Sequence, residues 1–171
     1  MPPMQRQSAF EAALGEHRRI VFKVATIYGR TAEDRSDLAQ EITLQLWRAF
    51  GGFDPRRGKL STWMYRIALN VAISYARRPS WKAAERSGPL EDHHLATLGA
   101  SPRAAPDDRV AALHAVIDQL APLDRALILL YLEERSHAEI GGILGLSETN
   151  VATKLNRLRH TLRTRMIAKG A

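Results

Sequence analysis

Apolar residues recur every three or four positions over much of the chain, which is the spacing of amphipathic helices. The first such run follows Ser8, which forms a capping box with Glu11, and it ends at Gly29. Its apolar face carries Phe10, Ala13, Leu14, His17, Val21, Val24 and Tyr28. Because no run shows the alternation of a strand, we expect an all-α protein.

Two more helices are expected before Pro79, which cannot continue a helix. A polar stretch, 30–36, precedes the first of them, and Gly51 and Gly52 end it. Its apolar positions are Leu38, Ile42, Leu46 and Ala49, with Trp47 and Phe50 beside them. The loop FDPRRGK leads to the last helix, which follows Ser61. The expected apolar face of that helix carries Trp63, Ile67, Val71 and Tyr75.

A second helical region begins after residues 80–107. That segment is rich in Pro, Gly, Ser and Ala, has no sustained hydrophobic period and predicts a flexible linker. Beyond it, Pro122 stands where the first turn of a helix tolerates proline. The helix before this proline is expected to bury Val110, Leu113, Ile117 and Leu120. The pattern therefore predicts two small helical domains, 8–79 and 108–168, joined by the linker.

The segment SHAEIGGILGLSETNVATKLNRLRHTLR has the spacing of a helix-turn-helix. Ser136 and Glu139 form a capping box at the start of its first helix, and Ser147 caps the second. Gly141 permits a close crossing of the two helices, and Gly145 supplies the left-handed conformation of a tight turn. The shared core is expected to contain Ile140, Leu144, Leu146, Val151, Leu155 and Leu158.

With that core turned inward, the second helix presents a polar and cationic face. Such a face suits the edges of DNA bases and phosphate groups. It carries Thr149, Asn150, Thr153, Lys154 and Arg157, next to the cap Ser147. The sequence thus predicts a DNA-binding helix that begins at Glu148.

The net charge of +7 is distributed unevenly. Residues 1–79 carry 13 basic and 7 acidic side chains, whereas residues 108–146 carry 3 basic and 6 acidic ones. Residues 147–171 carry 6 basic side chains and 1 acidic one, so positive charge is concentrated on the expected DNA-binding helix. This polarised charge indicates different partners for different surfaces.

Composition excludes several kinds of site. The chain has no cysteine, which rules out disulfides, thiolate zinc sites and cysteine nucleophiles. Its six histidines include the adjacent pair His93 and His94 but show no metal-ligand spacing, so we expect no metal and no cofactor. The longest apolar run, 126–132, is far shorter than a membrane span, and the first ten residues lack the apolar stretch of a signal peptide. A cytoplasmic protein without membrane insertion is expected.

Both helical regions together resemble a bacterial sigma factor of the extracytoplasmic-function (ECF) group of the sigma-70 family. The first domain is similar to the sigma region 2 bundle through AEDRSDLAQEITLQLW and FDPRRGKLSTWMYRIALNVAISYARR. The second is similar to the sigma region 4 helix-turn-helix through LAPLDRALILLYLEERSHAEIGGILGLSETNVATKL. The resemblance covers nearly the whole chain, in the order and spacing of the family. It implies a factor without catalytic activity that gives core RNA polymerase its promoter specificity.

The resemblance implies separate roles for parts of the first domain. The family's docking motif for the clamp helices of the largest polymerase subunit is matched by Asp37, Leu38, Gln40 and Glu41. The loop and third helix match the part of the family that engages and opens the −10 element. The matching residues are Arg56, Arg57, Lys59, Trp63, Arg66, Asn70, Arg77 and Arg78. Strand opening requires cations along the backbone and a stacking surface or pocket for an unpaired base.

Several of these side chains leave two interpretations open. Trp63 and Tyr65 either stack on an unpaired base or belong to the core. Asn70 either contacts a base or is an interior amide that fixes helix packing. The carboxylates of the docking motif form either a binding surface or an ordinary solvated helix face.

For the second domain the resemblance implies recognition of the −35 element in the major groove. Asn150 would pair with adenine, and Lys154 or Arg157 with guanine or phosphate. Two positions depart from the family pattern, since Ala152 replaces a frequent Lys and Leu69 replaces a frequent Arg. Each departure is expected to cost a phosphate contact. The family also implies control by an anti-sigma factor.

Two other functions compete with this one. A free-standing helix-turn-helix transcriptional regulator would bind a palindromic operator without polymerase. A metal-dependent nuclease would use Asp34, Asp37 and Glu41, but no further ligand is placed to complete a two-metal site.

Overall fold

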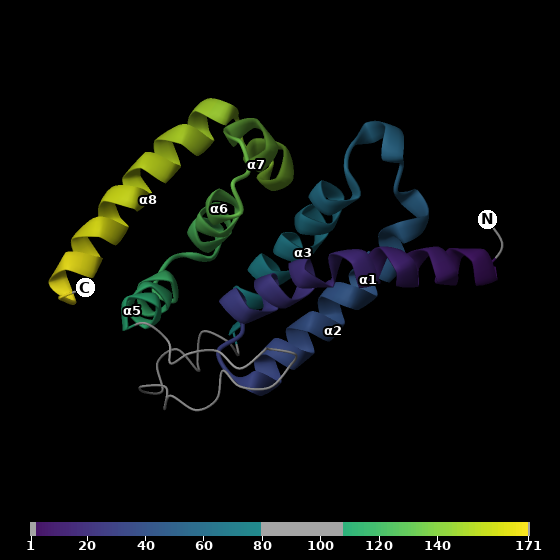
Figure 1. Cartoon of the computed structure of the whole chain (residues 1–171), viewed down its shortest axis with the longest axis horizontal. Helices are drawn as coiled ribbons and strands as arrows, with labels where there is room; N and C mark the ends of the chain where they lie inside the picture. Colours follow the sequence, from purple (N-terminus) through teal and green to yellow (C-terminus); the bar gives the residue numbers. More distant parts are fainter. Residues whose placement is uncertain (1–2, 80–107, 171) are drawn as a thin grey trace. The chain divides into compact units, whose positions relative to one another are not determined.

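The structure, a computed structural model, describes residues 3–79 and 108–170. The chain divides into two compact units, Met1–Lys82 (unit 1) and Ala83–Ala171 (unit 2). Three helices of unit 1 pack against one another, and two 3-10 turns connect the second to the third (Figure 1). These elements are α1 (Pro3–Tyr28), α2 (Ala32–Ala49), η1 (Phe50–Gly52), η2 (Pro55–Arg57) and α3 (Leu60–Ala76).

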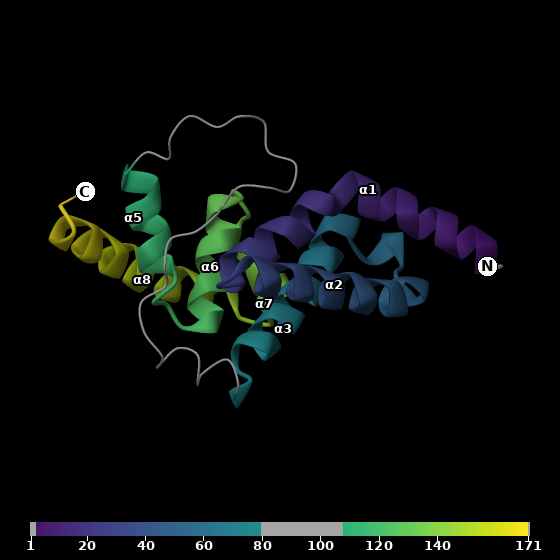
Figure 2. The same cartoon turned by 90° about the horizontal axis from the view of Figure 1, so that it is seen from below.

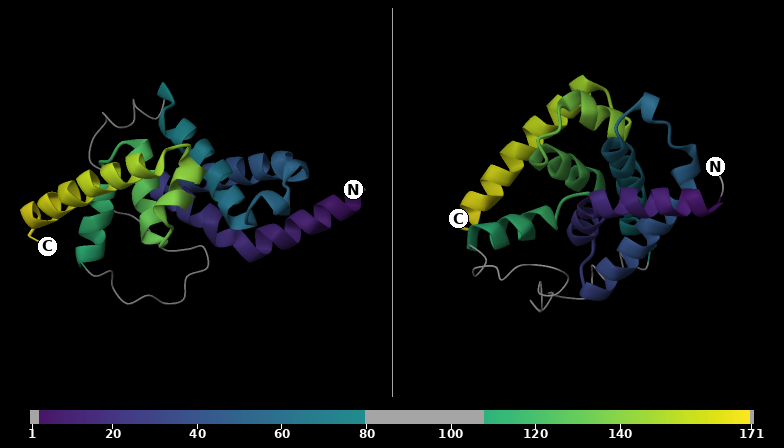
Figure 3. Two further views of the ribbon diagram at one scale, coloured as in Figure 1. Left: turned by 90° about the horizontal axis from the view of Figure 1, so that it is seen from above. Right: turned by 45° about the vertical axis from the view of Figure 1, so that its right-hand side comes forward.

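Unit 2 is built around its longest helix, α8, which contacts the other three helices of the unit (Figure 2). Its elements are α5 (Asp108–Ile117), α6 (Pro122–Leu132), α7 (His137–Leu144) and α8 (Glu148–Ala168). The described residues of both units form helices and turns and no strand, so the prediction of an all-α protein is confirmed (Figure 3). The expected linker, 80–107, lies outside the described residues.

Helix α1 begins earlier than the sequence predicts. It starts at Pro3, where the first turn tolerates a proline, so Ser8 lies inside the helix and the expected capping box with Glu11 does not form. At His17 the backbone leaves the helical conformation (φ −111°, ψ 15°), and α1 consists of two segments across a kink. The segment of α1 before His17 is therefore an additional helix, and its packing depends on contacts that the rest of α1 does not provide.

Arg6 attaches this first segment to the end of α2. Its Nη2 atom donates to the carbonyl oxygens of Trp47 (2.9 Å) and Arg48 (3.4 Å). Carbonyls in the last turn of a helix lack the usual partner one turn further on. The Trp47 carbonyl accepts from the Phe50 N–H instead, and the guanidinium adds a charged donor to it and to the Arg48 carbonyl. It also lies 4.7 Å from the centroid of the Trp47 ring. The Nε atom of Arg6 is buried without a hydrogen-bond partner, so the terminal nitrogens carry the polar contact.

A row of aromatic rings continues from this contact to the start of α3. Phe10 packs edge-on against Trp47 and Phe50, with 5.3 Å between ring centroids in each pair. Trp63 on α3 lies 6.3 Å from Phe50 and 5.3 Å from Phe53. Each such pair contributes about 0.5–1.5 kcal/mol beyond the burial of its area. The row thus ties α1, α2 and the connection between α2 and α3 together.

Helix α2 takes in most of the polar stretch 30–36 that was expected to precede it. Thr31 caps it: its Oγ1 accepts from the Asp34 N–H, and the Asp34 carboxylate accepts from the Thr31 N–H, both at 3.0 Å. The expected core residues Leu38, Ile42 and Leu46 are all fully buried, which confirms that stripe. Ala49, expected beside them, is exposed in the last turn.

Helix α3 buries a different face from the predicted one. The residues that it turns inward are Met64, Tyr65, Ala68, Leu69, Ala72 and Ala76. The predicted stripe, Trp63, Ile67, Val71 and Tyr75, is only half-buried. Alanines at every fourth position allow the backbone of α3 to approach α1 and α2 closely, and this close packing outweighs the larger side chains beside them. Leu69, one of the two departures from the family pattern, is fully buried on this inward face.

The helix-turn-helix of unit 2 follows the prediction closely. Both the capping box at Ser136 and the cap at Ser147 are formed, and Gly145 is left-handed with φ 71° and ψ 33°. An added Cβ at Gly141 would lie 2.5 Å from the carbonyl oxygen of Leu146, so the turn between α7 and α8 leaves no room for a side chain there. The expected core is buried except for Leu144 and Leu146, which are half-buried.

The contact between α5 and α6 differs from the prediction. Val110 is 48% exposed, and Val116 is fully buried instead. Arg125 on α6 is only 4% exposed, and its guanidinium donates to the carbonyl oxygens of Leu120 (3.0 Å) and Asp118. These carbonyls follow the end of α5, so a buried cation joins the two helices.

In the part of the chain that the structure describes, none of the helices combines the length and the apolar character needed to cross a membrane.

Replacing Arg6 with Met keeps an apolar stem but removes the guanidinium from the end of α2. We expect the free energy of unfolding of unit 1 to fall by about 1–2 kcal/mol, because two carbonyl groups lose a charged donor. Urea unfolding followed by circular dichroism measures this loss. The matched control is Arg18→Met, at an exposed position on the same helix, and an equal loss in both variants would contradict the attachment described here.

Replacing Gly141 with Ala tests the close packing of α7 against the turn that leads to α8. The Cβ would meet a backbone oxygen that cannot move aside, so we expect unit 2 to lose about 1–3 kcal/mol of stability in urea unfolding. Gly142 is its matched control, since nothing lies within 4 Å of a Cβ added there. Gly142→Ala should stabilise the helix by up to about 1 kcal/mol. Equal changes in the free energy of unfolding for both variants would show that the packing against the turn does not require glycine at position 141.

Candidate nucleic-acid interface

One side of α3 presents a row of polar and cationic side chains with one tryptophan. These residues recur at intervals of four, three, four and seven, which places them on one side of a helix. The row, called the α3 face, consists of Lys59, Trp63, Arg66, Asn70 and Arg77. All are exposed except Trp63, which is half-buried. Arg56 and Arg57 in η2 precede the row and Arg78 follows it, so the structure brings all eight predicted −10 residues to the exposed surface of one helix and its two ends.

Trp63 lies between the two environments considered for it, the core and the exposed surface. Part of its ring packs against Phe50 and Phe53, and part remains exposed on the α3 face. Tyr65 is only 2% exposed, so it belongs to the core and is not available for stacking. Asn70 is exposed, which rules out the interior amide. A half-exposed indole held by neighbouring rings is a rigid surface on which an unpaired base can stack.

The turn before α3 fixes one of its arginines. The carboxylate of Asp54 accepts from the Arg56 backbone N–H, Nε and Nη2, each at 3.0 Å. The side-chain hydrogen bonds from Arg56 hold the pKa of Asp54 below its ordinary value, and the same pair raises the pKa of Arg56. The exposed turn therefore presents Arg56 in one defined position, with its charge compensated locally, whereas Arg57 projects beside it at an exposed position.

A second polar row lies on α8. The row, called the α8 face, consists of Thr149, Asn150, Thr153, Lys154 and Arg157. Four of the five are exposed, and Lys154 is half-buried. Val151 and Leu155 point to the opposite side, into the core. The α8 face thus stands outward from a helix whose first turn is fixed by the turn at Gly145, as a helix that enters a DNA groove requires.

Hydrogen bonds within α8 use some of its polar groups. The hydroxyl of Ser147 accepts from the Asn150 N–H at 3.1 Å, so this predicted DNA contact also serves as the helix cap. The hydroxyl of Thr153 donates to the Thr149 carbonyl oxygen at 3.0 Å. Ala152 is half-buried at the edge of the face, where the family more often has a lysine.

An acidic surface lies on α2 and is distinct from both faces. This docking surface consists of Asp37, Gln40 and Glu41: the first two are exposed and Glu41 is half-buried. Leu38, the fourth residue predicted for it, is fully buried, so its side chain belongs to the core and cannot contact a partner. Glu41 pairs with Arg78, with 3.3 Å between Oε1 and Nη2. The predicted polymerase site and the predicted −10 site therefore meet at one ion pair.

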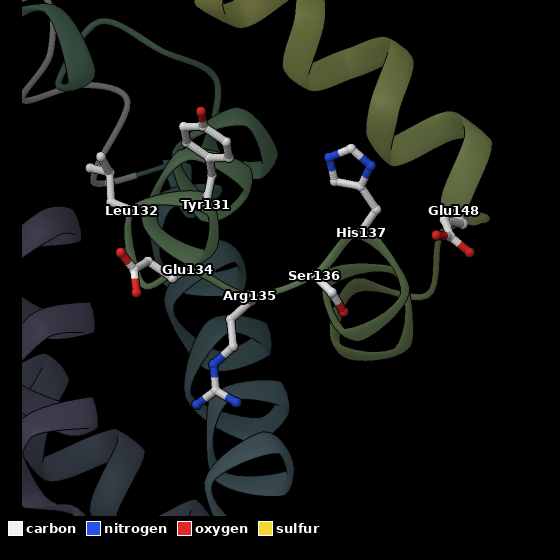
Figure 4. A pocket seen from close by; sticks show the side chains of 7 residues that line it. All are labelled: Tyr131, Leu132, Glu134, Arg135, Ser136, His137 and Glu148. Carbon is white, nitrogen blue, oxygen red and sulfur yellow. The ribbon is translucent and has the colours of Figure 1, made fainter.

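Unit 2 has an open groove of about 600 Å³, which the sequence analysis did not predict. It lies where α6, α7 and α8 converge, and it is lined by Tyr131, Leu132, Glu134, Arg135, Ser136, His137 and Glu148 (Figure 4). The rings of Tyr131 and His137 point the same way, whereas the guanidinium of Arg135 points the opposite way and pairs with Glu139 at 3.5 Å. Arg159 lies 5.7 Å from the Tyr131 ring centroid. The lining contains both acidic and basic side chains, and these residues do not form a recognisable set of catalytic groups.

The geometry gives no support to the nuclease alternative. Asp34 is committed to the capping box of α2, so its carboxylate is not directed at a shared site with Asp37 and Glu41. Within residues 3–79 and 108–170, no three carboxylate or imidazole groups stand close enough to hold a metal ion.

Comparison with known proteins matches each unit to a part of one family. Residues 14–82 match the family model of sigma-70 region 2, and residues 111–162 match that of sigma-70 region 4. The RNA polymerase sigma-H factor of Pseudomonas aeruginosa is 30% identical over 165 residues, which cover 90% of this chain and 84% of that protein. The ECF RNA polymerase sigma factor SigE of Mycolicibacterium smegmatis is 26% identical, and the match covers 91% of this chain but only 60% of SigE.

The fold is also similar to that of a solved sigma factor. RpoE, in complex with the anti-sigma factor NepR from Bartonella quintana, superposes with a TM-score of 0.68 at 18% identity, covering 92% of this chain and 96% of RpoE. The match of region 2 to unit 1 and of region 4 to unit 2, together with relatives aligned over nine-tenths of the sequence, makes the chain a member of the ECF group of the sigma-70 family, which are non-enzymatic factors of transcription initiation.

Proposed function

We propose that this chain binds core RNA polymerase and directs it to promoters. In this function the docking surface on α2 contacts the polymerase, the α3 face engages and opens the −10 element, and the α8 face contacts the −35 element. The observation that carries the proposal is the presence of two outward polar and cationic helix faces on two separate compact units. Two such faces suit two DNA elements on one promoter.

Each face has the chemistry that its role requires. On α3, cations and a half-exposed indole suit a single strand with an unpaired base. On α8, Asn150 suits the edge of adenine, and Lys154 and Arg157 suit guanine or phosphate. On α2, the carboxylates of Asp37 and Glu41 and the amide of Gln40 suit a basic partner surface.

Control and location follow from the same proposal. RpoE was solved with an anti-sigma factor, and we propose that an anti-sigma factor also controls this chain by covering the surfaces named above. A partner of core polymerase works in the cytoplasm. The alternative, a free-standing helix-turn-helix regulator, accounts for unit 2 but gives the acidic docking surface of unit 1 no role.

Run-off transcription tests the proposal directly. Purified core RNA polymerase transcribes a library of random promoter fragments with and without the chain, and with Asp37→Ala. We expect new transcripts that require the chain and that fall about tenfold with the variant at limiting factor, a loss of about 1.4 kcal/mol in docking. Glu33→Ala removes an exposed carboxylate from the first turn of the same helix and is the matched control. Tight binding of a palindromic duplex by the chain alone, without new transcripts, would favour the free-standing regulator.

The α8 face is tested on a promoter obtained in that experiment. Lys154→Ala and Arg157→Ala should each weaken promoter binding by the holoenzyme and reduce the slope of log K against log salt by about one, since each removes a phosphate or base contact. Asn150→Ala should instead relax base preference within the −35 element, with a loss of about 1–3 kcal/mol. Arg165→Ala, exposed near the end of the same helix, is the control. Identical salt slopes in all variants would exclude the α8 face from the interface.

A further inference from the structure

The ion pair between Glu41 and Arg78 joins two surfaces that are expected to bind different partners. Its nitrogen and oxygen are 3.3 Å apart, and the side chains of Arg78 and Glu41 are 48% and 37% exposed. Both groups are therefore within reach of a macromolecule that approaches either surface. The guanidinium also lies 4.9 Å from the ring centroid of Tyr75, in the last turn of α3.

The acidic surroundings of Glu41 favour retention of the Arg78 guanidinium when no partner is bound. Burial raises the pKa of Tyr75, and the carboxylates of Asp34 and Asp37 raise it further, while Arg78 opposes them. These opposing effects on the pKa of Tyr75 show that carboxylates of α2 and the guanidinium of Arg78 lie close to one another at the end of α3. Arg78 is the cation that offsets this negative charge.

A guanidinium paired with a carboxylate contributes little attraction for DNA. Carboxylates and phosphates compete for the same N–H donors of arginine. As long as Glu41 holds Arg78, the pair carries no net charge and its attraction for a phosphate is largely cancelled. A partner that engages Glu41 removes this competition.

We propose that Arg78 is shared between Glu41 and promoter DNA: Glu41 holds it in the free chain, and docking of core RNA polymerase on Glu41 releases it to the DNA backbone. The inference rests on the proposed function. By linkage the effect is reciprocal, so removal of Arg78 from Glu41 also strengthens polymerase binding. A half-exposed pair of this kind sets the size of each effect at about two- to fivefold.

The polymerase side is tested by a double-mutant cycle with the full chain and core RNA polymerase, with dissociation constants measured by fluorescence anisotropy. Glu41→Gln is expected to weaken binding, and Arg78→Gln to strengthen it about two- to fivefold, because the carboxylate no longer has to leave its partner. In the Glu41→Gln background, Arg78→Gln should have no effect. Arg77→Gln removes the neighbouring cation, which forms no ion pair with Glu41 among those described, and should behave identically in both backgrounds.

The DNA side uses the free chain and a labelled 30-nucleotide single strand of mixed sequence. Glu41→Gln should strengthen binding about two- to fivefold and steepen the salt slope by about one, since it adds one available cation. The gain should vanish when Arg78 is also replaced by Gln. Glu33→Gln, the same change of charge in the first turn of α2, should give a smaller gain that survives this replacement.

The outcomes separate the inference from the proposed function. If Glu41→Gln weakens polymerase binding but Arg78→Gln weakens it too or leaves it unchanged, the sharing of Arg78 is overturned while the docking surface stands. If the unmodified chain binds no core polymerase and yields no promoter-dependent transcript, the proposed function itself fails. Circular dichroism of each variant checks that these half-exposed substitutions leave the helices intact.

Discussion

Small side chains allow α3 to pack closely against α1 and α2, and the orientation of the exposed surfaces of unit 1 depends on this contact. Ala68 and Ala72 are fully buried, together with Leu69. Because a helix repeats every 3.6 residues, turning these positions inward turns the α3 face outward. A shift of one residue would rotate that face by about 100° and carry its cations towards the core. The same packing places Arg78 beside Glu41 at the end of α3.

Unit 2 depends on a comparable constraint at the level of the backbone. The carbonyl of Leu146 lies where a side chain at Gly141 would be, and Gly145 takes a left-handed conformation to let the chain turn. Ser147 then fixes the first turn of α8. These contacts involve neighbouring residues only, so the direction of α8 is set by the turn itself. The buried guanidinium of Arg125 adds the longer connection, from α6 to the end of α5.

The sequence predicts well the contacts between residues that are close together in the chain, and it misses contacts between residues that are far apart in it. The caps at Ser136 and Ser147 follow from residues three apart, and both are present. The contact of Arg6 with α2 spans 41 positions and has no local signal, and this contact is what gives the first segment of α1 a place to pack. The prediction for the inward face of α3 was wrong because it placed large apolar side chains such as Trp63 in the core, whereas the structure buries alanines there. The residues of the α8 face were predicted from the spacing of the helix-turn-helix. Those of the α3 face came from the family resemblance, and their exposure follows from packing that the hydrophobic period of α3 did not reveal.

Under the proposed function, a small bundle that binds both a polymerase and DNA must carry surfaces of opposite charge within a short distance. Unit 1 separates them by helix: carboxylates lie on α2, and cations lie on α3 and the turn before it. Arg56 and Arg78 nevertheless have acidic partners, Asp54 and Glu41. The first pair closes a turn within three residues, so it fixes the position of a cation. The second connects two helices whose proposed partners differ, so we expect its occupancy to depend on which partner is bound. An exposed pair costs little to break, and that low cost is what lets binding at one surface change the charge available at the other.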